Sequence, residues 1–337
     1  MSEVLEVNAS QDSLLKKRDH FRHLYQKLLW LRHSEETLAG LYKDQEMRTP
    51  THFGTGQEAV AVGVCEALSL NDVVYTHHRC HNHYLAKGGS LFKLASELYG
   101  REAGCSKGRG GSVHLTAREQ GFIISSAILA QTIPVATGSA LAFKMDGKPH
   151  VAVCFFGEAT CEEGAFYESL NYASVHQLPV LFVCENNLYS TESPLSTRQP
   201  AGTELCERVR SFKITAEKID GNDVNAVYDQ TSKALREIRA GKGPFFIEFM
   251  TYRWREHVGP YFDHEQNRNY RSLEELNQWM QQCPIKRSAQ FLLQNKFASV
   301  DELNTWEAET KEKVLAEVSQ AKQTNWPEAA TLFENVM

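Results

Sequence analysis

The stretch His150-Val-Ala-Val-Cys-Phe-Phe156 decides the fold, because its apolar residues follow one another without alternation. Such a run is typical of a strand that is buried on both faces. The residues at 162–176 indicate a helix, and Leu178-Pro-Val-Leu-Phe-Val-Cys184 is a second run of the same kind. Strand, helix and strand at this spacing predict an α/β fold with a doubly wound, mostly parallel sheet.

The pattern continues outward in both directions. Phe245-Phe-Ile-Glu-Phe-Met250 predicts a third buried strand after a helical segment near 223–240, and a strand-like run covers 72–76. Residues 14–43 have the apolar spacing of an amphipathic helix.

The tail is predicted to be helical, because Ser272-Leu-Glu-Glu275 and Ser299-Val-Asp-Glu302 fit the capping-box pattern. We therefore expect an N-terminal helical segment at 1–48, an α/β domain at 49–271 and a helical C-terminal extension at 272–337, packed on the same domain.

The composition excludes several function classes. The 337 residues are 42% hydrophobic and 23% charged, as in soluble globular proteins, and the net charge of −6 gives no attraction for nucleic acid or an anionic membrane. No run approaches the roughly 20 apolar residues of a membrane span. The polar residues 1–13 do not resemble a signal peptide, and eight cysteines without a Cys-x-x-Cys pair indicate a reducing, cytoplasmic location.

Polar side chains follow the two central strands at the point where each strand ends. Glu158 comes just after the first strand and Asn187 just after the second, 187 − 158 = 29 residues later. Each alone would be an ordinary turn or loop cap. Together they offer hard oxygen ligands at the edge of a parallel sheet where ligands bind, beside a helix start whose N–H groups suit a phosphate. The sequence thus predicts a diphosphate bridged to a divalent cation.

The motifs around these residues resemble a known family. Gly157-Glu-Ala followed by Glu185-Asn-Asn-Leu-Tyr189 is similar to the thiamine-diphosphate motif, which is commonly Gly-Asp-Gly followed by Asn-Asn. Glu162-Glu-Gly-Ala-Phe-Tyr-Glu-Ser-Leu-Asn171 resembles the alpha subunits of pyruvate, branched-chain 2-oxoacid and acetoin dehydrogenases. The resemblance runs from about residue 20 to about residue 325 and includes Gly56-Gln-Glu-Ala59, Lys107-Gly-Arg-Gly-Gly-Ser112, Asp220-Gly-Asn-Asp223 and Met250-Thr-Tyr-Arg253.

The resemblance implies a thiamine-diphosphate-binding fold and a role for each matched residue. Mg²⁺ is expected at Glu158, Asn187 and the backbone carbonyl of Tyr189. Two catalytic histidines are expected, His257 and His52, and His257 is also expected to contact the cofactor. The remaining cofactor contacts are expected from His78, Arg79, Ala127, Leu129, Gly157, Ala159 and Thr160, of which Ala127 and Leu129 cradle the aminopyrimidine through their backbone.

The resemblance also implies a reaction and partners. The chain would be the alpha subunit of a heteromeric dehydrogenase that decarboxylates a 2-oxo acid and passes the acyl group to a lipoyl carrier. A beta subunit would supply the glutamate that activates the cofactor, in an α2β2 heterotetramer, and a lipoyl acyltransferase would accept the product. An acyloin- or ketol-processing enzyme and a non-catalytic cofactor-binding scaffold are the alternatives.

Two departures from the family pattern bear on these expectations. Glu158 and Ala159 stand where the family usually has Asp and Gly. In Arg253-Trp-Arg-Glu-His257-Val-Gly-Pro260 only the second histidine of the usual His-Gly-His remains, and the Ser-rich continuation is missing. The identity of the substrate and regulation by phosphorylation therefore stay open.

A histidine-rich stretch allows a competing interpretation. His77, His78, His81 and His83 with Cys80 could be zinc ligands, but a structural zinc site needs four well-placed ligands with a supporting shell. We expect one phosphate contact and several polar loop histidines instead. The glycine-rich loop 104–112 is expected to be structural, and His114 to be an ordinary loop residue.

Overall fold

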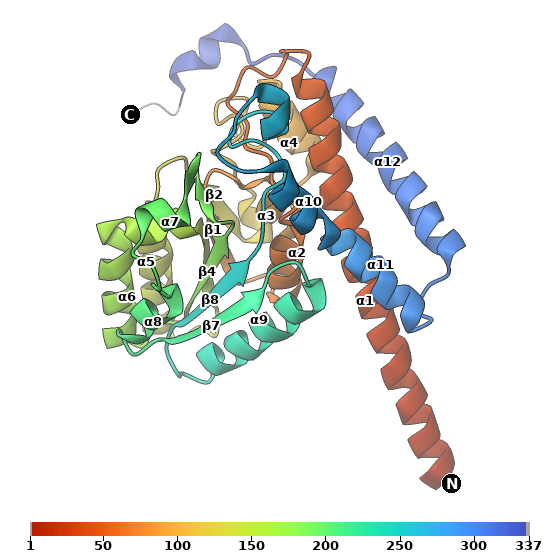
Figure 1. Ribbon diagram of the computed structural model, residues 1–337, viewed down its shortest axis with the longest axis vertical. Helices are drawn as coiled ribbons and strands as arrows, with labels where there is room; N and C mark the ends of the chain where they lie inside the picture. The colour runs from red at the N-terminus through yellow and green to blue at the C-terminus, as the bar shows by residue number, and fades with distance from the viewer. Residues whose placement is uncertain (1, 335–337) are drawn as a thin grey trace.

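The computed structural model describes residues 2–334, with side chains from residue 15 onward. A six-stranded sheet in the order β2-β1-β3-β4-β8-β7 forms its centre, and every neighbouring pair in it is parallel (Figure 1). The strands are β1 (Val73–Thr76), β2 (Phe122–Ser125), β3 (Ala152–Gly157), β4 (Val180–Asn186), β7 (Thr215–Asp220) and β8 (Phe245–Met250), and a small hairpin pairs β5 (Tyr189–Ser190) with β6 (Ser193–Pro194).

Helices cover both faces of this sheet (Figure 1). They are α1 (Ser2–Tyr42), α2 (Glu58–Ala67), α3 (His81–Ala86), α4 (Leu91–Leu98), α5 (Thr132–Met145), α6 (Gly164–Val175), α7 (Leu195–Arg198), α8 (Leu205–Arg210), α9 (Val224–Arg239), α10 (Leu273–Gln281), α11 (Pro284–Gln294) and α12 (Val300–Lys322). Four short 3₁₀ helices are η1 (Arg118–Gln120), η2 (Glu158–Glu162), η3 (Asp263–Gln266) and η4 (Ala329–Phe333).

Alternate residues of the central strands enter two separate hydrophobic cores. Val153 and Phe155 of β3 belong to the core that contains α1, α2 and α9 residues. Cys154 and Phe156 belong to the opposite core, which α5, α6 and α8 complete. Both faces of the strand are therefore dry, which explains why its sequence is apolar without alternation.

The predicted doubly wound α/β sheet is confirmed, and β3, β4, β8, α6 and α9 lie within about two residues of their predicted positions. Two details differ. The element that directly follows Gly157 is the 3₁₀ helix η2, not an α-helix, and His81 and His83 lie on α3 rather than in a loop.

The C-terminal helices begin at the predicted caps. Ser299 and Glu302 form a reciprocal capping box at α12, and the Ser272 hydroxyl accepts a hydrogen bond from the Glu275 N–H at α10. α12 runs along α1 and α4 (Figure 1). None of the described helices combines the length and apolarity needed to cross a membrane. The division at residues 48 and 271 stays a prediction.

One buried carboxylate organises the glycine-rich loop 104–112. Both oxygens of Glu97 accept backbone N–H groups, Oε2 from Ser106 and Gly108 at 2.7 and 3.0 Å, and Oε1 from Gly110 and Gly111 at 2.6 and 3.2 Å. The loop encloses a side chain of its own protein, which supports the expectation that it is structural.

We expect Glu97→Gln to lower the free energy of unfolding by about 2–4 kcal/mol, because an amide loses the charge and points N–H donors at other donors. Chemical denaturation measures this loss, with the exposed Glu102→Gln as control. Equal stability of the two variants would show that the carboxylate does not organise the loop.

Candidate functional site

The segments that hold the predicted site residues all leave the sheet at one edge. Gly157 of β3 pairs in register with Glu185 of β4, so that Glu158 and Asn187 follow neighbouring strand ends. The end of β1 lies beside that of β2, and the end of β8 lies beside that of β4. Residues from five separate parts of the chain therefore meet at the carboxyl edge, the usual ligand site of such sheets.

Glu158 is only 2% exposed, and its carboxylate is paired with an arginine that the sequence motifs do not include. Arg198, on α7, places Nη2 at 2.5 Å from Glu158 Oε1 and pairs through Nη1 with Glu162. Burial raises the pKa of Glu158, and Arg198 opposes that rise. Nothing in the sequence pattern relates two residues 40 positions apart, so this contact required the structure.

The second expected ligand segment is a sharply turned loop. The Asn187 side-chain carbonyl accepts the Tyr189 N–H at 3.2 Å, and its amide lies 3.5 Å from Gln57 Oε1. Between Asn187 and Tyr189, Leu188 has a φ of 73°, a left-handed conformation that leucine rarely adopts. Two hydrogen bonds hold Leu188 in this conformation. Its N–H donates to the Asn186 side-chain carbonyl, and its own carbonyl accepts the Leu195 N–H. Such strain is often found where a backbone must present a group to a ligand.

These residues fit a diphosphate with a divalent cation. Glu158 and Asn187 provide carboxylate and amide oxygens, which Mg²⁺ prefers. The Thr160 hydroxyl is buried without a hydrogen-bond partner among the described residues, and a Cβ added at Gly157 would meet nothing within 4 Å. Open space and a free polar group are thus both present where the diphosphate is expected. Ala159 is half-buried beside them.

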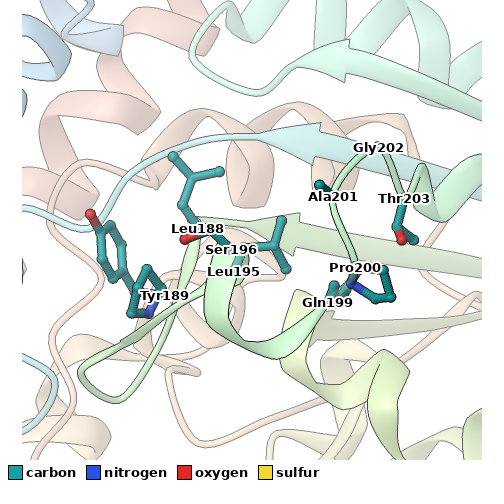
Figure 2. A pocket seen from close by; sticks show the side chains of 10 residues that line it. Leu188, Tyr189, Leu195, Ser196, Gln199, Pro200, Ala201, Gly202 and Thr203 are labelled. Carbon is teal, nitrogen blue, oxygen red and sulfur yellow. The ribbon is translucent and has the colours of Figure 1, made fainter.

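A pocket of about 400 Å³ lies next to this loop (Figure 2). Leu188 and Tyr189 line one side of it, and residues 194–196 and 199–203 line the rest. Most of the lining residues are apolar, and neither predicted catalytic histidine is among them. The pocket therefore lies beside the expected ligand loop and does not contain the predicted catalytic histidines.

Three histidines from distant segments form a cluster at the same edge. The ring centroid of His52 lies 4.6 Å from that of His78 and 5.0 Å from that of His257, and the last two are 5.4 Å apart. Arg79 ties the cluster together, since Nη1 donates to the Phe53 carbonyl at 2.6 Å and Nη2 to the His257 carbonyl at 3.3 Å. The two predicted catalytic histidines are therefore neighbours in space.

All three imidazoles are neutral near pH 7. Burial, and then the charge of Arg79, lowers the pKa of His52 to about 2 and that of His257 to about 3. Burial and the neighbouring His77 also hold the pKa of His78 well below its usual value. Burial lowers the pKa of Arg79 itself to about 9, with a further contribution from Arg253. The local positive charge thus favours an anion over an imidazolium here.

The other members of the histidine-rich stretch do not join this cluster. His77 and His83 place Nε2 at 3.0 and 3.1 Å from the buried Glu185, whose pKa they lower to about 2 although burial alone would raise it. His81 contacts Glu35 and Ser112 at 2.8 and 2.9 Å.

These contacts overturn part of the sequence-based expectation. His81 and His83 lie on α3, so describing them as loop histidines was wrong, whereas His77 is a loop residue, as expected. All three are buried. Cys80 lies against the Ser112 carbonyl, and the five candidate zinc ligands do not converge on one point. His114 is an exposed loop residue, as expected.

Ala127 and Leu129 are exposed in the loop that follows β2, near the end of β1. Their expected backbone contacts with an aminopyrimidine stay a prediction, as do the cofactor contacts of Gly157, Ala159 and Thr160.

The histidine cluster predicts a specific acid dependence of stability. Because the pKa of folded His52 is about 2, the unfolded chain alone takes up this proton as pH falls below about 6.5, and stability is lost by up to about 1.4 kcal/mol per pH unit. His52→Gln should therefore show a shallower loss of stability between pH 6.5 and 4 than the parent. Denaturation at several pH values measures this, with the exposed His114→Gln as control. Parallel pH profiles for all three proteins would contradict the assignment.

Comparison with known proteins identifies the family. The family described as dehydrogenase E1 component matches residues 26–330. The chain is 36% identical over 312 residues to a pyruvate dehydrogenase E1 component subunit alpha of Porphyra purpurea. The aligned region covers 90% of this chain and 88% of that protein. It is 32% identical over 313 residues to the alpha subunit of acetoin:2,6-dichlorophenolindophenol oxidoreductase of Bacillus subtilis. Here the aligned region covers 93% of this chain and 92% of that protein. It is 31% identical over 333 residues to a 2-oxoisovalerate dehydrogenase subunit alpha of Macaca fascicularis, and the aligned region covers 98% of this chain and 73% of that protein. The chain belongs to the dehydrogenase E1 component family.

Proposed function

We propose that this chain is the alpha subunit of a thiamine-diphosphate-dependent 2-oxoacid dehydrogenase and binds the cofactor together with Mg²⁺. One observation carries the proposal: oxygen ligands from two neighbouring strand ends lie at the same sheet edge as a cluster of three neutral imidazoles. This arrangement suits a metal-bridged diphosphate beside a reacting carbonyl. The named relatives support the reaction class.

Each group at the edge has a chemical task in this proposal. Glu158, Asn187 and the carbonyl of Tyr189 hold the metal, while Gly157, Ala159 and Thr160 line the diphosphate. Arg79 contributes positive charge and His78 an N–H donor to the same diphosphate. When bound, thiamine diphosphate supplies the carbon nucleophile and accepts the electron pair that carbon dioxide leaves behind.

The remaining two histidines serve the substrate. As neutral imidazoles, His257 and His52 each carry one N–H that can donate to an oxygen that gains negative charge during attack on the 2-oxo carbon. A neighbouring cationic arginine strengthens such stabilisation, because Arg79 is only 4% exposed and solvent screens a buried charge weakly. These residues therefore act as donors at the reacting centre.

The proposal includes partners. A beta subunit supplies the carboxylate that activates the aminopyrimidine, in an α2β2 heterotetramer, and a lipoyl acyltransferase accepts the acyl group. The exposed apolar side chains of Ile128 and Leu129, 64% and 39% accessible, support a subunit contact beside the cofactor. Eight free cysteines support a cytoplasmic location.

A second candidate function is the oxidation or formation of an acyloin or another ketol without a lipoyl partner. The altered segment 253–260 and the likeness to an acetoin oxidoreductase alpha subunit favour it. A non-catalytic scaffold is less consistent with the retained ligand residues and histidines. Screening 2-oxo acids and acyloins with the assembled enzyme and an artificial electron acceptor separates the three functions.

Cofactor binding should require both the metal and its amide ligand. We expect titration calorimetry of the assembled protein to show thiamine diphosphate binding with Mg²⁺ and none after EDTA treatment. Asn187→Ala should weaken binding at least about 10-fold, because an oxygen ligand is lost. The exposed Asn171→Ala is the matched control. Equal affinity with and without metal would exclude the proposed site.

Substitution of His257 should separate binding from turnover. We expect His257→Ala to reduce single-turnover decarboxylation on the order of 10²-fold while cofactor affinity is nearly kept, because a donor to the transition state is removed. Cofactor titration and rate are measured on one preparation. If the variant assembles and binds the cofactor normally but keeps the parent rate, His257 only packs in the loop.

A further inference from the structure

We infer that Arg198 is a positioning residue for the metal site, which holds the Glu158 carboxylate in place and links it to the hairpin that carries the other two ligands. This inference rests on the proposed function. It concerns an arginine 40 residues beyond Glu158 in the sequence, for which neither the motifs nor the relatives' names suggest a role.

The contacts of Arg198 are directed and partly buried. Its side chain is only 12% exposed, and its two terminal nitrogens bind Glu158 and Glu162 separately. Nε donates to the Ser193 carbonyl at 3.3 Å, which fixes the guanidinium plane against its own hairpin. Among the described residues, no other side chain donates a hydrogen bond to the Glu158 carboxylate. Arg198 therefore sets the orientation of this carboxylate.

The hairpin turns these contacts into a closed ring. It begins with Asn187 and Tyr189, pairs β5 with β6, and ends at Arg198 on α7. The Leu195 N–H donates to the Leu188 carbonyl at 2.8 Å, so α7 is bonded directly to the ligand loop. Arg198 then reaches back to Glu158 at the end of β3. The three expected ligands thus belong to one loop of chain, which Arg198 closes through its ion pairs with Glu158 and Glu162.

Charge explains why this ion pair is needed. A carboxylate that is only 2% exposed would be costly without a partner. A guanidinium offers several N–H groups in one plane and engages Glu158 through a single oxygen, Oε1. One carboxylate oxygen is thereby bound, and the orientation of the group is fixed. Hydrogen bonds that orient metal-binding carboxylates commonly change metal affinity about 10- to 100-fold.

Packing alone does not fix the hairpin. The pocket of about 400 Å³ lies along it, between Leu188 and the residues that follow α7, so this side of the hairpin faces open space rather than a packed core (Figure 2). Its tip is also held by Arg253, which donates to the Thr191 carbonyl at 2.5 Å, and by Arg268, which pairs with Glu192 at 2.7 Å. Arg198 is the residue that ties the hairpin to Glu158, so metal binding should be sensitive to its loss.

The test uses the full-length chain assembled with its partner subunit, and Mn²⁺ as a spectroscopic substitute for Mg²⁺. Free Mn²⁺ is measured by electron paramagnetic resonance at saturating thiamine diphosphate. We expect Arg198→Met to weaken Mn²⁺ binding at least about 10-fold and Arg198→Lys to restore part of the affinity, because lysine keeps the charge but not the fork. Hydrogen exchange of residues 188–199 should slow on Mn²⁺ addition in the parent and much less in Arg198→Met.

A matched control separates orientation of Glu158 from general anchoring. Arg208 also ties this segment to α6, through Gln199 and the Tyr167 hydroxyl, but touches no expected metal ligand. Arg208→Gln should leave Mn²⁺ affinity within about twofold of the parent value. Glu162→Gln removes the second ion-pair partner of Arg198 and keeps Glu158. It should reduce Mn²⁺ affinity less than Arg198→Met does, and it provides a second test if Arg198→Met fails to fold.

The outcomes are distinct. Unchanged or tighter Mn²⁺ binding in Arg198→Met would overturn the inference, and tighter binding would show that the arginine competes with the metal. An equal loss in Arg208→Gln would also overturn it, because general anchoring would then account for both losses. If the parent protein binds no Mn²⁺ with thiamine diphosphate, the proposed function itself fails and the inference fails with it.

Discussion

The parallel direction of all six strands is the constraint on which the rest of the structure depends. Since no strand of the main sheet turns directly back into its neighbour, each return passes through a helix or a long connection and each strand ends at the same edge. Helices on both faces follow from this, and so do strands that are apolar throughout. The register of β3, β4 and β8 then brings Glu158, Asn187 and the segment that leads to His257 together, although 99 residues separate the first from the last (257 − 158).

Buried charge gives this edge its chemistry. Glu185 is ionised in the interior because two imidazoles share it, and Arg79 is satisfied by two backbone carbonyls rather than by an acid. An arginine that lacks a carboxylate partner retains an uncompensated charge in a region of low dielectric constant. Burial, and then that charge, keeps the neighbouring histidines neutral, and the charge is available to an anion. The same residues thus contribute to the lowered pKa values and to a local positive charge that favours an anion.

The centre of the fold is more predictable from the sequence than its edges. β3, β4 and β8 are recognisable because a short, continuous apolar run bounded by turn residues is typical of a strand buried on both faces. β7 is not, since the edge strand Thr215–Asp220 has one solvated face and includes Glu217 and Lys218. α3 also escapes prediction, because a six-residue helix is too short to show an apolar period.

The candidate site divides in the same way. Glu158 and Asn187 could be predicted because each follows a recognisable strand. The contact between His52, His78 and His257 is a product of tertiary folding, and their roles came from family resemblance rather than from spacing. Arg198 shows the limit most clearly, since no periodicity connects a residue on a one-turn helix with a carboxylate after β3. An ion pair between residues far apart in the sequence can be recognised only after the positions of the strands in the fold are known.

The neutral histidines and the buried arginine also imply that ligand binding and protonation are linked. Burial and Arg79 hold the pKa of His257 at about 3, so this imidazole carries no charge before an anion arrives. A diphosphate beside Arg79 would offset the arginine charge and raise the pKa of each nearby imidazole. By thermodynamic linkage, whatever raises those pKa values must itself bind more tightly when the histidines take up protons. The imidazoles therefore add no positive charge to that of Arg79 before an anion is bound, and each neutral ring still carries one N–H that can donate a hydrogen bond.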